Sequence, residues 1–594
     1  MIAETGSASD VPPTVQGVIA ARLDVLPPSE KTLLQDASVL GKVFWRGGVE
    51  ALGSAVADDV LVSLTRRELL RRARASTVAG ETEFAFRHAL VRDVAYGQIP
   101  RAARADKHRR AAEWIAATSA TRADLVAHHY LEALQLTEAA GGDGSSLREP
   151  ARVALTAAGD RARSLGAPDD AIVLYRRALA LAPDALDLLL KVAFAGPDSD
   201  GSGLAEGQQA WSLYAKAGDS LGAARAAVAV ARSLWFTGDA PRAQAAIADA
   251  VTQARLADDG ALLGEALEEQ SRGLMTAGRN EEALAAAEEA IAYTTRHSLS
   301  GPAVHARVTF ATTLGNLGDD RCLPMLEEVA EEADRLNESR ALLRALNNIS
   351  HLHWMAGRLD LSWQAWELAR KRMARFSLPT AASWLTSNGA AMALARGDWE
   401  QVTGLLEEYG RVTGTRAYYL EPQTTRVRAV LAYARGAPAA LDELEQLAVD
   451  ISAGDPQVAR DGIEFLGVAY ALDSRVTDAT ALAQRLAAVA TTESSSAYPG
   501  LLSLLTGIDV TAGLKRVSPW QEANRLLAAG HPEDALAILD TIGARTDAAI
   551  VRLALAQSQG PEPWAAEAEA FFIEVDATRL RREVESLRAN RRSA

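Results

Sequence analysis

Apolar side chains recur with a helical period along most of this chain, in paired segments that glycines separate. Between Gly238 and Gly436 these glycines stand 39 or 40 residues apart. A residue that ends a helix and reverses the chain favours left-handed backbone angles, which glycine adopts at little cost. The pattern therefore predicts a helix pair around each of eight turn glycines: Gly166, Gly238, Gly278, Gly318, Gly357, Gly397, Gly436 and Gly530.

Small residues follow the turn glycines at fixed distances, which indicates close packing between helices. Alanines stand five residues after three of the glycines and twelve residues after five, the same three included: Ala171, Ala243 and Ala283, then Ala178, Ala250, Ala290, Ala330 and Ala369. Small side chains at such points let paired helices approach and let each pair nest on the next. The long gap before Gly238 has room for one degenerate unit, and a weaker unit is expected around Ser474.

The segment from Gly166 to Pro183 resembles the second half of a tetratricopeptide (TPR) unit at its glycine, small residues, aromatic residue and terminal proline. The period near 40 exceeds the standard TPR unit of about 34 residues, so the helices should be about a turn longer. We expect an all-α fold: a TPR-like superhelical solenoid of about ten helix pairs over residues 150–560, with capping helices at 561–594.

The first 140 residues predict a different, compact domain. Pro12-Pro13 can open one helix, Ser29 is placed to cap a second, and a third pattern runs from Asp58 to Arg72. Residues 75–78 and 83–87 then flank a turn, which is typical of a β-hairpin. Three helices and a hairpin predict a winged-helix-like domain over residues 1–140, with trailing helices near 102–117 and 123–139, and the Gly/Ser-rich stretch 141–149 predicts a linker.

Phe84-Ala-Phe-Arg-His88-Ala-Leu-Val-Arg-Asp93-Val-Ala-Tyr96 resembles the histidine segment that closes the winged-helix domain of STAND-type signalling ATPases. The resemblance implies that His88 would contact the β-phosphate of ADP held by a separate P-loop module. Ala89 replaces the aspartate of the family motif, and Asp93 keeps a later acidic position. The alternative is that His88 ends the hairpin and bonds to backbone.

A phosphate-binding G-x-x-x-x-G-K-[ST] loop is absent from the sequence, since Gly41-Lys42 is followed by Val43. We therefore expect the chain itself to bind no cofactor, and ATP or ADP only through an ATPase module that is absent or supplied by a partner. Together with the stretch from Val11 to Asp24, the His88 segment looks most like STAND regulators linked to class III adenylate or guanylate cyclases. No cyclase carboxylates, nucleophile motif or metal-binding motif is present, so we expect no enzymatic activity.

Net charge bears on nucleic-acid binding. The formal charge is −15, yet residues 1–140 hold 17 Lys/Arg and 17 Asp/Glu, so the excess acid lies in the repeats. An acidic array is a poor scaffold for phosphates. The basic run Arg66, Arg67, Arg71, Arg72 and Arg74 would suit a DNA-binding winged helix, but Asp58, Asp59 and Glu68 are interleaved with it, which favours a solvated or domain-contacting face. A DNA-binding transcription regulator is thus the alternative function.

Two groups of residues are candidates for a ligand groove. Trp363 and Trp366 stand three apart on one expected helix and share a face, within a cluster of five tryptophans. Asn347 and Asn348, on the preceding helix, could bind a peptide backbone. The groove would hold a protein, a peptide or a small effector, although interhelical packing is the commoner role for such tryptophans.

The remaining chemistry excludes several classes. Cys322 is the sole cysteine, so no internal disulfide can form, and a reduced cytoplasmic compartment is expected. No stretch approaches the about 20 apolar residues of a bilayer span. His128-His129 and the pair His351 and His353 lack the i, i+4 spacing of a helical metal site. We therefore expect a cytoplasmic, non-catalytic sensor and protein-interaction arm of a signalling ATPase or nucleotide cyclase.

Overall fold

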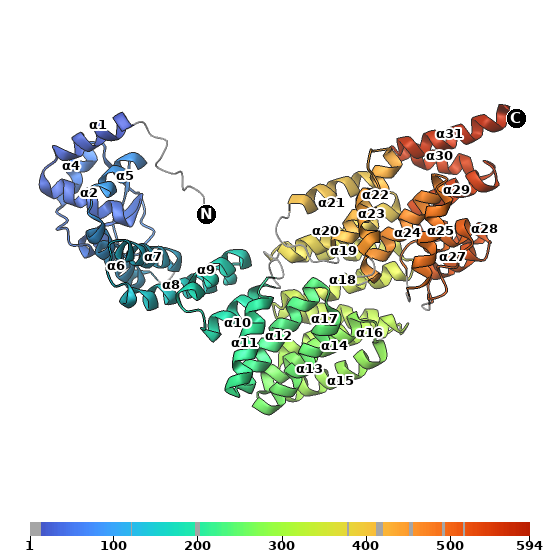
Figure 1. The fold of residues 1–594 in the computed structure, drawn as a ribbon, viewed down its shortest axis with the longest axis horizontal. Coiled ribbons are helices and arrows are strands. Elements are labelled where there is room, and N and C mark those ends of the chain that lie inside the picture. The colour runs from blue at the N-terminus through green and yellow to red at the C-terminus, as the bar shows by residue number, and fades with distance from the viewer. Residues whose placement is uncertain are drawn as a thin grey trace. The chain divides into compact units, whose positions relative to one another are not determined.

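The computed structural model describes residues 13–119, 122–196, 202–376, 379–411, 420–450, 456–489, 494–514 and 517–593. Within them the chain forms thirty-one helices and three short strands (Figure 1). It divides into two compact units, Met1–Val192 and Ala193–Ala594. The fold is therefore all-α with one small sheet, as the sequence predicted.

The first unit opens with helices surrounding a three-stranded antiparallel sheet of order β1-β3-β2. Its core is built from side chains such as Leu33, Leu34, Phe44, Leu64 and Phe86. The elements in chain order are α1 (Pro13–Asp24), α2 (Pro28–Leu40), β1 (Val43–Trp45), α3 (Arg46–Ala51), α4 (Asp58–Arg66), β2 (Leu70–Arg72), β3 (Glu83–Phe86) and α5 (Ala89–Gly97).

Three local predictions in this region were wrong. The third helix ends at Arg66 and not at Arg72, because Glu68 adopts φ 60° and reverses the chain into β2. The hairpin strand therefore lies at 70–72 instead of 75–78. Ser29 does not cap α2, whose N-cap is Pro27 without a side-chain hydrogen bond. The three-residue strand β1 was not predicted, since it is too short to show alternation.

Four further helices complete the first unit: α6 (Arg101–Thr118), α7 (Ala123–Ala139), α8 (Ser145–Ser164) and α9 (Pro168–Leu181), and α10 (Leu186–Ala195) spans the division. Residues 145–149, expected in a linker, form the first turn of α8, where Asp143 accepts hydrogen bonds from the Ser145 backbone and hydroxyl. Since α7 and α8 pack together, residues 141–149 do not separate two bodies, and the division falls at Val192.

The second unit begins with a long row of helix pairs. The predicted turn glycines from Gly238 to Gly436 all have left-handed φ angles between 70° and 87°, and Ser474 has φ 60°. The small residues that follow them are buried, as predicted. The helices are α11 (Leu204–Ala217), α12 (Ser220–Thr237), α13 (Ala240–Ala257), α14 (Gly260–Thr276), α15 (Asn280–Arg296), α16 (Ser300–Asn316), α17 (Cys322–Arg335), α18 (Ser339–Met355), α19 (Leu359–Met373), α20 (Pro379–Arg396), α21 (Trp399–Arg411), α22 (Leu420–Arg435), α23 (Asp442–Asp450), α24 (Pro456–Leu472), α25 (Val476–Ala487) and α26 (Tyr498–Thr506).

The two helices of each pair belong to different layers. The first helices of successive pairs, α12, α14, α16, α18, α20 and α22, contact one another and form what we call the inner helices. Their partners α13, α15, α17, α19 and α21 form the outer helices. This two-layer arrangement is a TPR-like helical solenoid, the repeat class that the glycine spacing predicted.

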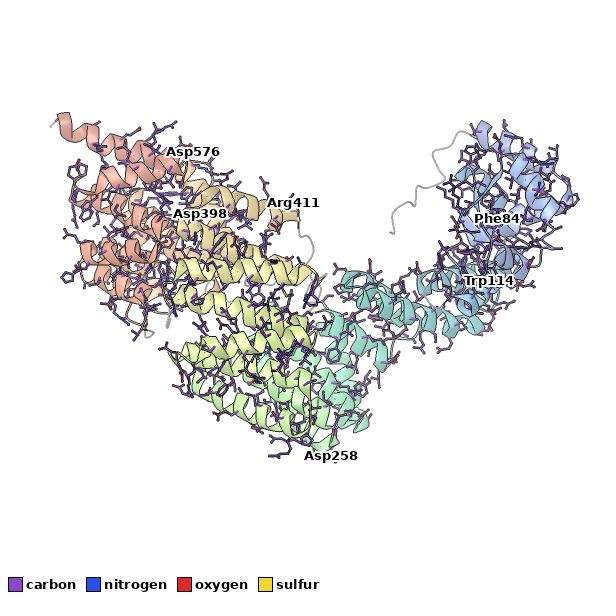
Figure 2. The ribbon with its side chains drawn as sticks, turned by 180° about the vertical axis from the view of Figure 1, so that it is seen from behind. Phe84, Trp114, Asp258, Asp398, Arg411 and Asp576 are labelled. Carbon is purple, nitrogen blue, oxygen red and sulfur yellow. The ribbon has the colours of Figure 1, made fainter. Side chains whose placement is uncertain are left out.

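The last five helices do not extend this row. They form a second row alongside it: α27 (Pro519–Ala528), α28 (Pro532–Ile542), α29 (Arg545–Gln559), α30 (Trp564–Glu574) and α31 (Thr578–Ser593), drawn in orange and red beside yellow α18–α22 in Figure 1. Figure 2 labels Asp398, next to Gly397, at the border between the rows. The single continuous array expected up to residue 560 is thus replaced by two rows, and the expected caps at 561–594 belong to the second.

The second row contacts the turns of three successive pairs. A methyl group built on Gly357 would lie 2.7 Å from Ile542, one on Gly397 would lie 2.7 Å from Phe571, and one on Gly436 would lie 3.2 Å from Arg579. Around Gly278 and Gly318 the same position is open. The later turn glycines are therefore needed for close contact between the rows as well as for their backbone angles.

Candidate functional site

Trp366 is part of the core, which is the commoner of the two roles that its sequence allowed, and it does not line a groove as the other role required. Its side chain is 3% exposed, and its indole N–H donates to the backbone carbonyl of Leu385 at 2.7 Å. The ring fills the space above Gly389, where an added Cβ would approach it to 2.2 Å. Packing between α19 and α20 therefore accounts for this tryptophan.

Trp363 is half-buried on the same outer helix, with its ring centroid 4.4 Å from that of Trp366. The guanidinium of Arg396 lies 5.4 Å from its ring. Because α19 is an outer helix and Asn347 and Asn348 lie on inner helix α18, the structure does not gather the four predicted groove residues into one site.

The two asparagines belong to a ladder of side-chain amides on the inner helices. Asn348 donates from Nδ2 to the Thr312 hydroxyl of α16 at 2.7 Å. Asn388 of α20 donates to Oδ1 of Asn347 at 2.8 Å. Gln423 of α22 donates to Oδ1 of Asn388 at 3.1 Å. These hydrogen bonds link four successive inner helices through polar side chains.

A charged cluster continues the ladder toward α12. Arg232 donates to Glu269 at 2.6 Å and to Glu265 at 2.8 Å, both on α14. Arg272 also pairs with Glu269. On α18, Arg344 donates to Glu268 at 2.9 Å, to Nδ1 of His305 at 3.0 Å and to the Thr309 hydroxyl at 2.7 Å. Ion pairs and hydrogen bonds thus connect α12, α14, α16 and α18.

These charged side chains are largely removed from water, and their pKa values reflect that. The side chain of Arg344 is 15% exposed and that of Glu268 6%. Burial lowers the pKa of Arg344, and the charge of Glu268 offsets part of this effect. Burial also raises the pKa of Glu269, but Arg272 and Arg232 outweigh it and hold that pKa well below its usual range.

His305 is neutral at physiological pH. Burial lowers its pKa to about 4, although the nearby charge of Glu268 acts in the opposite direction. Its Nδ1 therefore accepts the hydrogen bond from Arg344, which fixes the tautomer with hydrogen on Nε2.

We call this continuous set of side chains the inner polar strip. It comprises Arg232, Glu265, Glu268, Glu269, Arg272, His305, Thr309, Thr312, Arg344, Asn347, Asn348, Asn388 and Gln423. Sequence reasoning found Asn347 and Asn348 but missed the rest. The sequence does contain a pattern that could have revealed them. Counting back from each turn glycine, polar residues recur at six, at nine or ten, and at thirteen positions before it, which places them on one face of each inner helix.

The strip offers hydrogen-bond donors and acceptors in a regular series. Side-chain amides present both an N–H and a carbonyl, which is the pair that an extended peptide backbone presents in return. The strip holds no nucleophile paired with a base. Within the described residues no group of three or more metal-ligating side chains comes together, and no helix combines the length and hydropathy needed to cross a bilayer.

His88 lies in the first unit, exposed, immediately before α5. Its backbone is extended, with φ −128° and ψ 130°, and its side chain makes no capping hydrogen bond. Ala89, which stands where the family motif has an acceptor, opens the helix. The imidazole is therefore presented at the surface at a helix N-terminus.

Three other histidines of the first unit come together, which the sequence did not indicate. Nδ1 of His108 on α6 lies 2.9 Å from Nδ1 of His129 on α7, and its Nε2 lies 2.9 Å from the hydroxyl of Tyr96 on α5. The ring of His128 is within 6.2 Å of that of His108. Spacing within α7 alone could not reveal a partner contributed by α6.

No protein-family model matches the sequence, and no curated protein matches it. Among solved structures, a STAND protein with a tetratricopeptide repeat sensor, PH0952 from Pyrococcus horikoshii, is similar at 13% identity and a TM-score of 0.37 over 74% of this chain. This chain covers 65% of that protein.

Two Rap proteins are also similar at a low level. A Rap protein complexed with competence and sporulation factor has 15% identity and a TM-score of 0.37, covering 57% of this chain and 94% of that one. The Rap conjugation regulator of plasmid pLS20, in complex with the Phr* peptide, has 16% identity and a TM-score of 0.36, covering 54% and 90%. Likeness at this level carries no argument about what the present chain binds.

Proposed function

We propose that this chain is a non-catalytic sensor and protein-interaction arm that binds a peptide or small effector on the inner polar strip. The observation that carries the proposal is the amide ladder of Asn347, Asn348, Asn388 and Gln423, which runs across successive inner helices. Ligand contacts in a solenoid come from equivalent positions of successive repeats. Such a ladder spans several repeats, so it suits an extended peptide, whose backbone groups recur along its length, better than a compact metabolite, which would contact one or two repeats.

The polar character of this largely buried layer favours a binding role for the strip over a purely structural one. An apolar inner layer would pack equally well, and replacing buried ion pairs by apolar residues is often neutral or stabilising. Here charges and amides occupy this layer over six helices, and Glu265 is still 37% exposed. The strip is therefore held in order by its own hydrogen bonds while some of its polar atoms remain accessible.

The coupling partner in this proposal is a signalling ATPase or nucleotide-cyclase module outside the chain. We interpret the order α2, β1, α3, α4, β2, β3 as a winged helix, and exposed His88 at the start of α5 as the contact to nucleotide held by that module. Ligand capture by the repeats would shift how the winged helix holds the ATPase.

Selection of displayed random peptides on the full-length chain tests the proposed site. Peptides selected this way should bind about tenfold more weakly for each of Asn348→Leu and Asn388→Leu, because each change removes roughly 1.4 kcal/mol of backbone hydrogen bonding. Glu289→Gln, on outer helix α15, is the matched control and should leave binding unchanged. If the double variant Asn348→Leu, Asn388→Leu bound the peptides as tightly as the parent, the inner polar strip would not be the binding site.

The purified chain is expected to bind neither ATP nor ADP. A P-loop supplies most phosphate contacts through its backbone amides, and His88 alone cannot replace them. Calorimetry with Mg²⁺ should show no saturable heat for the parent chain or for His88→Ala. Micromolar binding would overturn the assignment of nucleotide contacts to another module.

Binding to duplex DNA, the competing function, is expected to be negligible at physiological salt. Several cations of the first unit are paired, as in Arg46–Asp58 at 2.6 Å, Arg67–Glu30 at 3.4 Å and Arg87–Glu68 at 3.3 Å. Anisotropy of a labelled duplex should not change on titration. A steep inverse salt dependence, lost in the double variant Arg71→Ala, Arg72→Ala, would instead favour the transcription regulator.

A further inference from the structure

The first unit contains a pocket of about 340 Å³ beside strand β1. The pocket is lined by the end of α2, by β1 and by the start of α7, including Leu40, Val43, Trp45 and Leu125. Phe84 of β3 and Trp114 of α6 mark this region of the first unit in Figure 2. The pocket is separate from His88 and from the inner polar strip, which belongs to the second unit.

Strand β1 presents unpaired backbone groups to this pocket. It is an edge strand in the order β1-β3-β2. The carbonyl of Lys42 accepts from the Phe86 N–H at 2.9 Å, and the Arg46 N–H donates to Thr82 at 3.0 Å. In this register the alternate residues Val43 and Trp45 direct their backbone groups away from β3.

The outward N–H groups of Val43 and Trp45 have no hydrogen-bond partner among the described residues. Trp45 is nevertheless only 2% exposed. Buried backbone N–H groups are paired in the great majority of native structures. An added strand would pair these groups in the manner of β-augmentation.

The charges around the pocket select the kind of strand. Lys42 is exposed and has no ion pair in the described part of the chain. Arg122 lies 4.9 Å from the Trp45 ring. Burial raises the pKa of Glu83, but hydrogen bonds from Thr77 and Trp45, together with the charge of Arg122, outweigh it and lower that pKa. Glu83 is the one carboxylate among the lining residues. Its Oε2 accepts from the Trp45 indole at 3.2 Å and from the Thr77 N–H and hydroxyl at 2.8 and 2.6 Å. Because Glu83 offsets part of the Arg122 charge, Lys42 is the cation left to face a ligand.

We propose that the β1 edge is a docking site for an extended, acidic peptide segment of a partner protein. The segment adds as a fourth strand through the backbone of Val43 and Trp45, and places a carboxylate beside Lys42. The apolar side chains Leu40 and Leu125 receive an alternate side chain of the same segment. This proposal does not depend on ligand binding at the inner polar strip.

The test uses the full-length chain and three defined probes. The first is a capped heptapeptide alternating valine and glutamate, the second replaces glutamate by lysine, and the third is the first with alternate backbone nitrogens methylated. We expect saturable binding of the acidic peptide alone, with slowed hydrogen exchange at the amides of residues 43 and 45. No binding of the acidic peptide, or equal binding of the methylated one, overturns the proposal.

Variants provide a second readout. Lys42→Glu should weaken the acidic peptide at least tenfold, and it leaves the fold intact because that side chain is exposed. Arg74→Glu, an equal charge change at another exposed site, should have no effect. Unchanged affinity in Lys42→Glu, or exchange protection over residues 340–400 with none at 43 and 45, would contradict docking at β1. Binding to a second copy would appear as concentration-dependent mass without added peptide and would also overturn it.

Discussion

Replacing Trp520 by alanine is expected to lower the free energy of unfolding of the second unit by about 3–5 kcal/mol. Trp520 is 0% exposed on α27, and its indole N–H donates to the backbone carbonyl of Trp354 on α18 at 2.9 Å. The two rings stack with centroids 5.8 Å apart. The substitution would leave a cavity between the rows and remove one of the two hydrogen bonds that the Trp354 carbonyl accepts, the other coming from the Gly357 N–H at 2.9 Å. Urea unfolding followed by circular dichroism measures the change.

A matched variant separates packing from the hydrogen bond. Trp520→Phe keeps most of the buried ring and removes the N–H, so a loss of about 0.5–1.5 kcal/mol is expected from the one hydrogen bond, since the Trp354 carbonyl keeps the Gly357 N–H as a donor. If Trp520→Ala costs less than 1 kcal/mol, an amount typical of an exposed site, the second row is not docked on α18 as described.

Acidification is expected to destabilise the first unit through its buried histidines. Burial lowers the pKa of His108 to about 3, and the positive charges of His128, Arg92 and Arg104 act in the same direction. Burial likewise holds the pKa of His129 well below its usual value. In the unfolded chain both would titrate near pH 6.5.

Because the unfolded state takes up these protons first, stability is fully present above about pH 7 and is lost as pH falls through 6.5 toward 3. The loss should reach about 2 kcal/mol per histidine between pH 7 and pH 5. Thermal unfolding of the parent and of the double variant His108→Leu, His129→Leu over this range measures it. Parallel pH profiles would show that the histidine pair does not contribute.

The repeat architecture was predictable because each turn is specified locally. Each helix pair needs a left-handed turn residue and small residues at fixed distances from it, and both features lie within the pair's own sequence. The turns from Gly238 to Gly436 could therefore be assigned without knowing which helices pack beside them. The β-hairpin of the first unit was predicted less accurately, since Glu68 reverses the chain without being glycine and moves β2 ahead of the predicted strand.

The second row was not predictable, because it depends on contacts between distant segments. Trp520 contacts Trp354, and Thr546 accepts a hydrogen bond from the Trp399 indole at 3.0 Å. The sequence around these residues contains no pattern that identifies such distant partners. For the same reason Trp363 and Trp366 were candidates for a groove beside the commoner packing role, whereas Trp354 and Trp399 hold the rows together and Trp366 fills the space over Gly389. Only Asn347 and Asn348 of the inner polar strip were predicted. Polar residues on an amphipathic helix are normally interpreted as its solvent-facing side, and the sequence does not show which helices form the inner layer.

Hydrogen exchange on the full-length chain, with and without a peptide obtained by selection on it, tests the proposed binding site most directly. The proposal predicts slowed exchange in α16, α18, α20 and α22 around Thr312, Asn348, Asn388 and Gln423, with the outer helix carrying Trp363 unchanged, and no such protection in the variant Asn348→Leu, Asn388→Leu. Protection confined to residues 40–46, or to the outer helices, in a saturated complex would contradict it and place the ligand elsewhere.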